Sequence, residues 1–93
     1  MIPYRIEFAK PAIRQLAKLP RNLRQRISDR IETLAVDPRP AGCKKLVDTE
    51  SLYRLHEGDY RIIYQVKDDA LLVLIVRIGH RGDVYRNLPD VKT

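Results

Sequence analysis

The sequence predicts an α+β protein in which a pair of helices packs on one face of a single β-sheet. Three observations carry this prediction. An alternating segment opens the chain, two segments with apolar residues at helical spacing follow, and three strand-like segments come after them. Short turns between the last three segments favour an antiparallel meander. Residues 1–93 are expected to form one domain, because a chain of this length has a single core.

The first half of the chain predicts one strand and two helices. Residues 4–8 alternate between polar and apolar side chains, as a strand does. A helix is expected at 9–19, with Pro11 tolerated in its first turn and Pro20 ending it. Its apolar stripe is Ala12, Ile13, Leu16 and Leu19. A second helix is expected at 22–35, with the stripe Leu23, Ile27, Ile31 and Leu34.

The second half predicts the meander. Residues 37–42 are rich in proline and glycine and predict a loop. Strands are expected at 52–57, 60–66 and 71–78, with Asp68 and Asp69 in a tight turn between the last two. The nearly continuous apolar run at 71–76 is typical of an interior strand covered on both faces.

Composition points to a soluble cytoplasmic protein. Hydrophobic residues make up 44% of the chain and charged residues 32%, as in globular proteins. The apolar run at 70–76 is far shorter than the roughly 20 residues that cross a bilayer, and the N-terminus lacks the pattern of a signal peptide. The single cysteine, Cys43, excludes an intrachain disulfide and a cysteine-based zinc site. No metal or other cofactor is predicted.

The positive charge is concentrated in the first half of the chain. The net charge is +6; residues 1–47 contribute eleven bases and four acids, and residues 48–93 seven bases and eight acids. Such a basic half is typical of a surface that binds a polyanion, most often nucleic acid. A solvated, arginine-rich helix face is the alternative. The candidate RNA- or ribosome-binding residues are Arg21, Arg24, Arg26, Arg30, Lys44 and Lys45.

Alternation along the strands predicts a cationic cluster on the face without helices. Arg54 and His56 share one face of their strand. Arg61 belongs to the next strand and lies on the face opposite to that strand's apolar side chains. Arg81 follows the last strand and shares parity with Arg77. Such groups repel one another, so their convergence favours a bound anion. The alternative is that the arginines lie over apolar neighbours or pair with Glu57, Asp59 and Asp83.

Three short motifs resemble those of the RelE family of bacterial toxins, over nearly the whole chain. They are Tyr53-Arg54-Leu55-His56, Gly58-Asp59-Tyr60-Arg61, and the run from Gly79-His80-Arg81 to Tyr85. The resemblance implies that the catalytic residues are Arg54, His56, Arg61, Arg81 and Tyr85, with accessory roles for His80 and Arg77. The familiar RelE pattern has two lysines where this chain has Arg54 and His56.

The resemblance also implies a reaction and partners. RelE-like toxins cleave messenger RNA in the ribosomal A site without a metal, by attack of a ribose 2′-hydroxyl on its own 3′-phosphate. Histidine is suited to proton transfer near neutral pH, and arginine to holding the phosphate. The partners implied are mRNA, the ribosome and a RelB-like antitoxin, whose amphipathic segment is expected to land in an apolar groove between the helices and the sheet.

Two other classes stay open. The ParE branch shares this fold but inhibits DNA gyrase, and it usually lacks the histidine and tyrosine that follow the last strand here as His80 and Tyr85. A non-catalytic nucleic-acid-binding relative would keep the basic surface and tolerate loss of His56 or Tyr85. A metal site is disfavoured, because the two histidines are far apart in sequence and stand outside any metal-binding motif.

Overall fold

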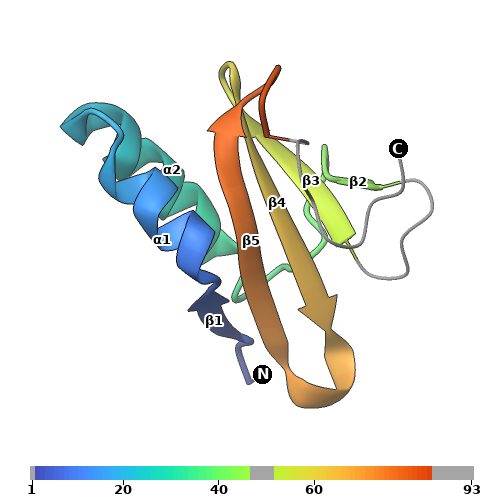
Figure 1. The fold of residues 1–93 in the computed structure, drawn as a ribbon. Coiled ribbons are helices and arrows are strands. Elements are labelled where there is room, and N and C mark those ends of the chain that lie inside the picture. The colour runs from blue at the N-terminus through green and yellow to red at the C-terminus, as the bar shows by residue number, and fades with distance from the viewer. Residues whose placement is uncertain (1, 47–51, 85–93) are drawn as a thin grey trace.

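The computed structural model describes residues 2–46 and 52–84, which form a five-stranded sheet with two helices on one face (Figure 1). The helices are α1 (Lys10–Ala17) and α2 (Arg21–Thr33). The strands are β1 (Arg5–Phe8), β2 (Lys44–Lys45), β3 (Leu52–Glu57), β4 (Tyr60–Lys67) and β5 (Leu72–His80). The predicted α+β class and the helices on one face are confirmed. Both helices end earlier than predicted; α1 stops before Pro20, whose ring disfavours helical backbone in the residue before it.

The strand order is β1-β5-β4-β3-β2, so the chain's first strand lies beside its last. The three strands β3, β4 and β5 form the predicted antiparallel meander. β1 pairs with β5 in parallel, with the Arg5 N–H donating to Leu71 O and the Ala9 N–H to Ile75 O. This parallel pair and the two-residue edge strand β2 were not predicted. With β1 on one side and β4 on the other, β5 is the interior strand that its apolar run predicted.

The main core lies between the helices and the sheet. The helical layer contributes four buried side chains, Ala12, Ile27 and Ile31 from the helices and Leu34 directly after α2. The sheet contributes seven: Leu55, Ile62, Tyr64, Val66, Val73, Ile75 and Ile78. Ile13 belongs to the predicted apolar stripe of the first helix but is 54% exposed. The reason is that α1 packs on the sheet through the preceding residue, Ala12, which is buried. Gln15 Oε1 accepts the Ile78 N–H at 2.7 Å, and this bond ties α1 to the part of β5 beyond its pairing with β1.

A β-bulge in β5 decides which side chains reach the face without helices, called the open face below. Ile63 pairs with Arg77 while its neighbour Tyr64 pairs with Ile75, so Val76 is an extra residue in β5. Strict alternation would put Arg77 on the same face as Val73 and Ile75, under the helices. The bulge instead lets Ile75 and Ile78 both enter the core and puts Arg77 on the open face, opposite Ile63.

The connection from β4 to β5 is longer than the tight turn predicted at Asp68 and Asp69. A short 3₁₀ helix (Asp68–Ala70) is followed by Leu71 in the left-handed region, with φ 50°. A two-residue hairpin turn usually needs glycine or asparagine for its positive φ, and neither stands here. The strand therefore begins at Leu72 and not at 71.

Candidate active site

The open face carries a row of four cationic or imidazole side chains across three neighbouring strands. Lys44 of β2 lies directly opposite Arg54 of β3. His56, two residues further along β3, lies directly opposite Arg61 of β4. Directly opposite residues share a face of the sheet, and so do residues two apart in one strand. Lys44, Arg54, His56 and Arg61 are called the basic row below.

The basic row lowers the pKa of its histidine. The pKa of His56 lies below its ordinary value because partial burial disfavours the imidazolium, and because Arg61, Arg54 and Lys44 repel a further positive charge. The ring is therefore largely neutral at physiological pH. A neutral imidazole beside fixed positive charges is able to accept a proton from a substrate whose phosphate those charges hold.

Arg61 is folded over the loop between β3 and β4. Its Nη1 donates to Gly58 O at 3.3 Å and to Tyr60 O at 3.2 Å. Only two residues join the strands, and Gly58 takes the positive φ of 61° that such a hairpin needs at its first loop position. Both bonds are long and their acceptors are neutral, so a phosphate oxygen is the stronger partner for this guanidinium.

Arg81 lies at the same end of the sheet. Its backbone N–H donates to Asp59 O at 2.9 Å, which ties the end of β5 to the β3–β4 loop. The chain then turns, with His80 O accepting the N–H groups of Asp83 at 2.9 Å and Val84 at 3.1 Å. This turn keeps the backbone of Arg81 at the end of the sheet where His56 and Arg61 lie, and its side chain is exposed.

Val84 brings the chain after β5 back over the open face. Its side chain is 3% exposed and packs with Leu52 and Ile63, which lie on the open face of β3 and β4. Gly79 lies beside Val84, and a Cβ at that position would meet Val84 at 3.5 Å, an ordinary van der Waals distance. The predicted catalytic Tyr85 follows directly but lies outside the described residues.

The two predicted accessory residues lie on different faces. Arg77 stands on the open face, half-buried and opposite Ile63. His80 pairs with Tyr60, and their rings meet edge to face with centroids 5.7 Å apart. Tyr60 packs on the core beneath the helices, so His80 is on the helix side of the sheet and away from His56.

Several of the basic residues predicted to bind RNA or the ribosome have partners within the protein. Arg26 forms an ion pair with Glu57 at 2.8 Å, and Arg30 approaches the same carboxylate at 3.9 Å. Arg24 donates to Ala17 O at 3.4 Å. Arg21 is exposed at the start of α2, and Lys45 lies opposite Tyr53 on the helix side of β2. The basic helix face is thus partly neutralised by Glu57.

A polar clamp on the helix side holds the strands that carry the basic row, and the sequence did not indicate it. Arg39 forms a two-pronged pair with Asp68, at 2.8 and 3.1 Å, and its Nε donates to Tyr53 Oη at 2.9 Å. Tyr4 Oη also donates to Asp68, at 2.6 Å. Tyr64 stacks on Tyr53 and donates to Pro38 O at 2.8 Å. Arg39 and Asp68 are 29 residues apart, so no local pattern relates them.

The clamp predicts a pH-dependent loss of stability when it is removed. Arg39 first, and then Tyr4, lowers the pKa of Asp68 from 3.8 to about 2. A carboxylate with a lowered pKa stabilises the fold above its ordinary pKa, and this contribution is lost as the pH falls toward 2. Asp68→Asn is therefore expected to lower Tm at neutral pH, with the difference from wild type shrinking as the pH falls below about 4.

Thermal unfolding followed by circular dichroism across this pH range measures the effect. Asp69→Asn, in the same turn, is the matched control, because Asp69 forms no ion pair within residues 2–46 and 52–84. Equal pH dependence in the two variants would contradict the role given to Asp68.

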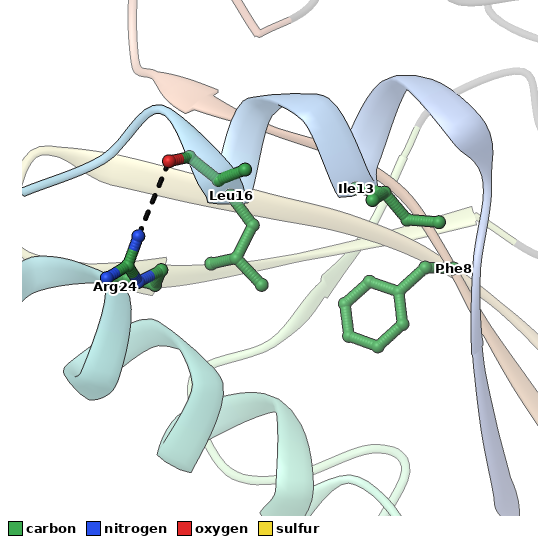
Figure 2. Close-up of a pocket in the computed structure, with 5 residues that line it drawn as sticks. Phe8, Ile13, Leu16 and Arg24 are labelled. Atoms are coloured by element: carbon green, nitrogen blue, oxygen red, sulfur yellow. Dashed lines mark hydrogen bonds between the residues drawn. The ribbon is translucent and has the colours of Figure 1, made fainter. Parts of the chain in front are cut away.

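An apolar groove lies between the helices and β1. It has a volume of about 390 Å³ and is lined by Phe8, Ile13, Leu16, Ala17 and Arg24. Figure 2 shows Leu16 and Phe8 projecting into the space below α1, with Ile13 at its rim and Arg24 reaching across from α2. An apolar floor with one cationic edge matches the groove that the sequence predicted between the helices and the sheet.

The described parts of the chain contain neither a membrane-spanning helix nor a metal-binding cluster. Neither α1 nor α2 is long and apolar enough to cross a bilayer. Within residues 2–46 and 52–84, no three side chains of the histidine, cysteine, aspartate and glutamate types gather as metal ligands would.

The fold and the sequence have counterparts in known toxins. Residues 6–85 match the family described as the ParE toxin of the type II toxin–antitoxin system parDE. The chain is 31% identical to Toxin RelG of Mycobacterium tuberculosis, over 91% of this chain and 99% of that protein. It is 27% identical to the mRNA interferase toxin RelE of Escherichia coli, over 88% of this chain and 90% of that protein.

A solved complex contains a chain with a similar fold. The RelE–RelB complex from Pyrococcus horikoshii OT3 superimposes with a TM-score of 0.77 at 30% identity, covering 89% of this chain and 100% of the matched chain. Fold, family match and curated relatives agree on one superfamily. The chain therefore belongs to the RelE/ParE superfamily and is a RelE-family toxin of a toxin–antitoxin system.

Proposed function

We propose that this toxin is an endoribonuclease that cleaves messenger RNA in the ribosomal A site, with the ribose 2′-hydroxyl as nucleophile. The observation that carries the proposal is the basic row, which sets His56 opposite Arg61 on an exposed sheet face. The E. coli relative named mRNA interferase supports the same reaction class.

The reaction needs three things from the protein. A proton must leave the 2′-oxygen, the added negative charge on the phosphate must be stabilised, and the departing 5′-oxygen must gain a proton. His56 is the general base, since its lowered pKa keeps the ring neutral. Arg61 and Arg81 hold the phosphate, because a guanidinium stays charged and grips two oxygens at once. Tyr85 either orients the scissile nucleotide or assists the transfer of a proton to the departing 5′-oxygen.

The products follow from the nucleophile. The 2′-oxygen bonds to phosphorus and the bond from phosphorus to the 5′-oxygen breaks, giving a 2′,3′-cyclic phosphate and a 5′-hydroxyl end. The nucleophile belongs to the substrate, so the reaction consumes no water, and no metal ion is required to generate hydroxide.

The shape of the site accounts for the need for a ribosome. Proton transfer by a positioned side chain supplies about 10²–10⁴-fold of rate, whereas aligning nucleophile and leaving group is worth about 7–11 kcal/mol. The basic row lies on an exposed sheet face, and His56 itself is exposed, so the protein offers few contacts to align a flexible RNA. The ribosome supplies that alignment by holding the message.

Primer extension on a defined message in a bacterial translation extract tests the proposal. Sharp stops are expected only with both protein and ribosomes, and they should vanish with Arg81→Ala. Ends that a ligase joins only after 5′-phosphorylation would identify the 5′-hydroxyl product. Cleavage that leaves 5′-phosphate ends would overturn attack by the 2′-hydroxyl. A message that stays intact would overturn the proposed nuclease activity.

Gyrase inhibition is the second candidate, because the matched family model is that of a ParE toxin. A supercoiling assay with purified gyrase distinguishes the two functions. Inhibition with an intact message would establish the ParE activity. If the protein neither cleaves the message nor inhibits gyrase, it is a nucleic-acid-binding relative without either activity.

The apolar groove is the proposed landing place of the antitoxin. Solved complexes of RelE with RelB support an antitoxin partner for this chain. An amphipathic antitoxin segment would bury apolar side chains on Phe8, Ile13 and Leu16 and set acidic ones beside Arg24.

A charge placed in the groove is expected to release the toxin. Ile13→Asp puts a carboxylate where the antitoxin's apolar side chains would pack, and we expect it to weaken the complex at least tenfold, about 1.4 kcal/mol. Isothermal titration calorimetry with the antitoxin measures this. Val36→Asp is the matched control, because Val36 is also an exposed β-branched residue and does not line the groove. Equal affinities for the two variants would place the antitoxin elsewhere.

A further inference from the structure

The two lysines of the edge strand β2 face opposite sides of the sheet. Lys45 pairs with Tyr53, whose ring packs on the core beneath the helices. Lys44 pairs with Arg54, which shares the open face with His56. Two adjacent lysines that look equivalent in the sequence therefore have different surroundings, and only Lys44 extends the basic row.

The position of β2 is fixed from the helix side. The loop before it is held by Tyr64, which donates to Pro38 O, and by Arg39, which binds Asp68 and Tyr53. At its other end, the Leu46 N–H donates to Leu52 O at 2.9 Å. A strand of two residues forms few ladder bonds, so these anchors keep Lys44 in register with Arg54.

Lys44 has a charge that the described protein does not neutralise. Within residues 2–46 and 52–84, no carboxylate forms an ion pair with it, whereas Arg26, Arg30 and Arg39 all have acidic partners. Its ammonium is exposed and lies close enough to His56 to disfavour protonation of the ring. An exposed, uncompensated cation in line with Arg54 and Arg61 favours a phosphate as its partner.

We propose that Lys44 is a catalytic residue that binds the RNA phosphate next to the one held by Arg61. The proposal rests on the proposed nuclease function. The strands β2 and β4 are separated by β3, and Lys44 and Arg61 are offset by two residues along the strands, so their backbones are about 12 Å apart. From that separation the long lysine and arginine side chains can converge on neighbouring phosphates of one RNA strand, and His56 lies on the strand between them.

Alanine substitution of each lysine tests the proposal in the ribosome-dependent cleavage assay. Lys44→Ala is expected to lower the single-turnover rate at saturating ribosomes by about 10- to 100-fold, the usual cost of a lost charge-assisted bond. Lys44→Arg should restore most of the rate. Lys45→Ala, which removes the same charge from the other face, should change only the ribosome concentration required. Lys67→Ala, on the open face at the far end of β4, should cleave like wild type.

A second measurement is independent of cleavage. The pKa of His56, followed by NMR titration of its ring, is expected to rise in Lys44→Ala because a repelling charge is gone, and to rise less in Lys45→Ala. An equal change in both variants would show that Lys44 does not face the site and would overturn the proposal.

The outcomes separate this proposal from the function on which it rests. If the wild-type protein cleaves, Arg61→Ala is inactive and Lys44→Ala is fully active, the role of Lys44 alone is overturned. Wild-type protein that leaves the message intact would overturn the nuclease and this role together.

Discussion

Arg61→Ala is expected to slow ribosome-dependent cleavage by about 10²–10³-fold, the usual cost of removing one group that stabilises the charge of a transition state. In the free protein the guanidinium rests on two carbonyl groups of its own hairpin loop, at 3.2 and 3.3 Å. We expect the guanidinium to exchange these weak bonds for two hydrogen bonds to a phosphate. Arg61→Ala should therefore lower the cleavage rate much more than it lowers the stability of the fold.

Single-turnover primer extension at saturating ribosomes measures the rate, and Tm reports folding. Arg61→Lys keeps the charge but not the two-pronged geometry, so its rate should lie between those of alanine and wild type. Arg5→Ala, at the far edge of the sheet, removes an exposed arginine and should cleave normally. An Arg61→Ala protein with normal Tm and wild-type rate would remove this residue from the mechanism.

His56→Ala is expected to lower the cleavage rate by about 10²–10⁴-fold, the range that a positioned base supplies. The wild-type pH–rate profile should rise with pH with its midpoint below the ordinary histidine pKa of 6.5, because partial desolvation and three cationic neighbours lower the pKa of His56. Only the neutral ring accepts a proton, so the rate falls as the pH drops through that lowered pKa.

The alanine variant should lose this acidic limb, and its residual rate should be nearly independent of pH across the same range. His80→Ala is the informative comparison, because His80 lies on the helix side against Tyr60 and a smaller effect is expected. If His80→Ala lowers the cleavage rate more than His56→Ala does, the general base lies on the other face of the sheet.

Local periodicity was enough to predict most of the elements. The stripes at Ile27 and Ile31 and the alternation of Ile62 and Tyr64 each reflect one element packing on one core. The same alternation predicted that Arg54 and His56 share a face, and their register with Arg61 is consistent with it. Ile13 was misplaced because a helical stripe is wider than the strip that contacts the sheet.

The parts that were not predicted depend on partners far away in the chain. β1 pairs with β5 through backbone hydrogen bonds, which any residue can form, so the sequence of β1 does not indicate which strand it pairs with. The bulge at Val76 follows from the need to bury both Ile75 and Ile78, which only the packed core imposes. Lys44 and Lys45 look alike until pairing with β3 separates them.

Short-range patterns of polarity and residue chemistry were sufficient to predict the fold class, the helices, the meander and the identity of the cationic groups. The tertiary structure alone decided that Arg77 reaches the open face, that His80 does not, and that Lys44 joins Arg54, His56 and Arg61 in one row. The physical reason is that faces and registers are set by hydrogen bonds and packing between segments tens of residues apart, and no local pattern encodes them.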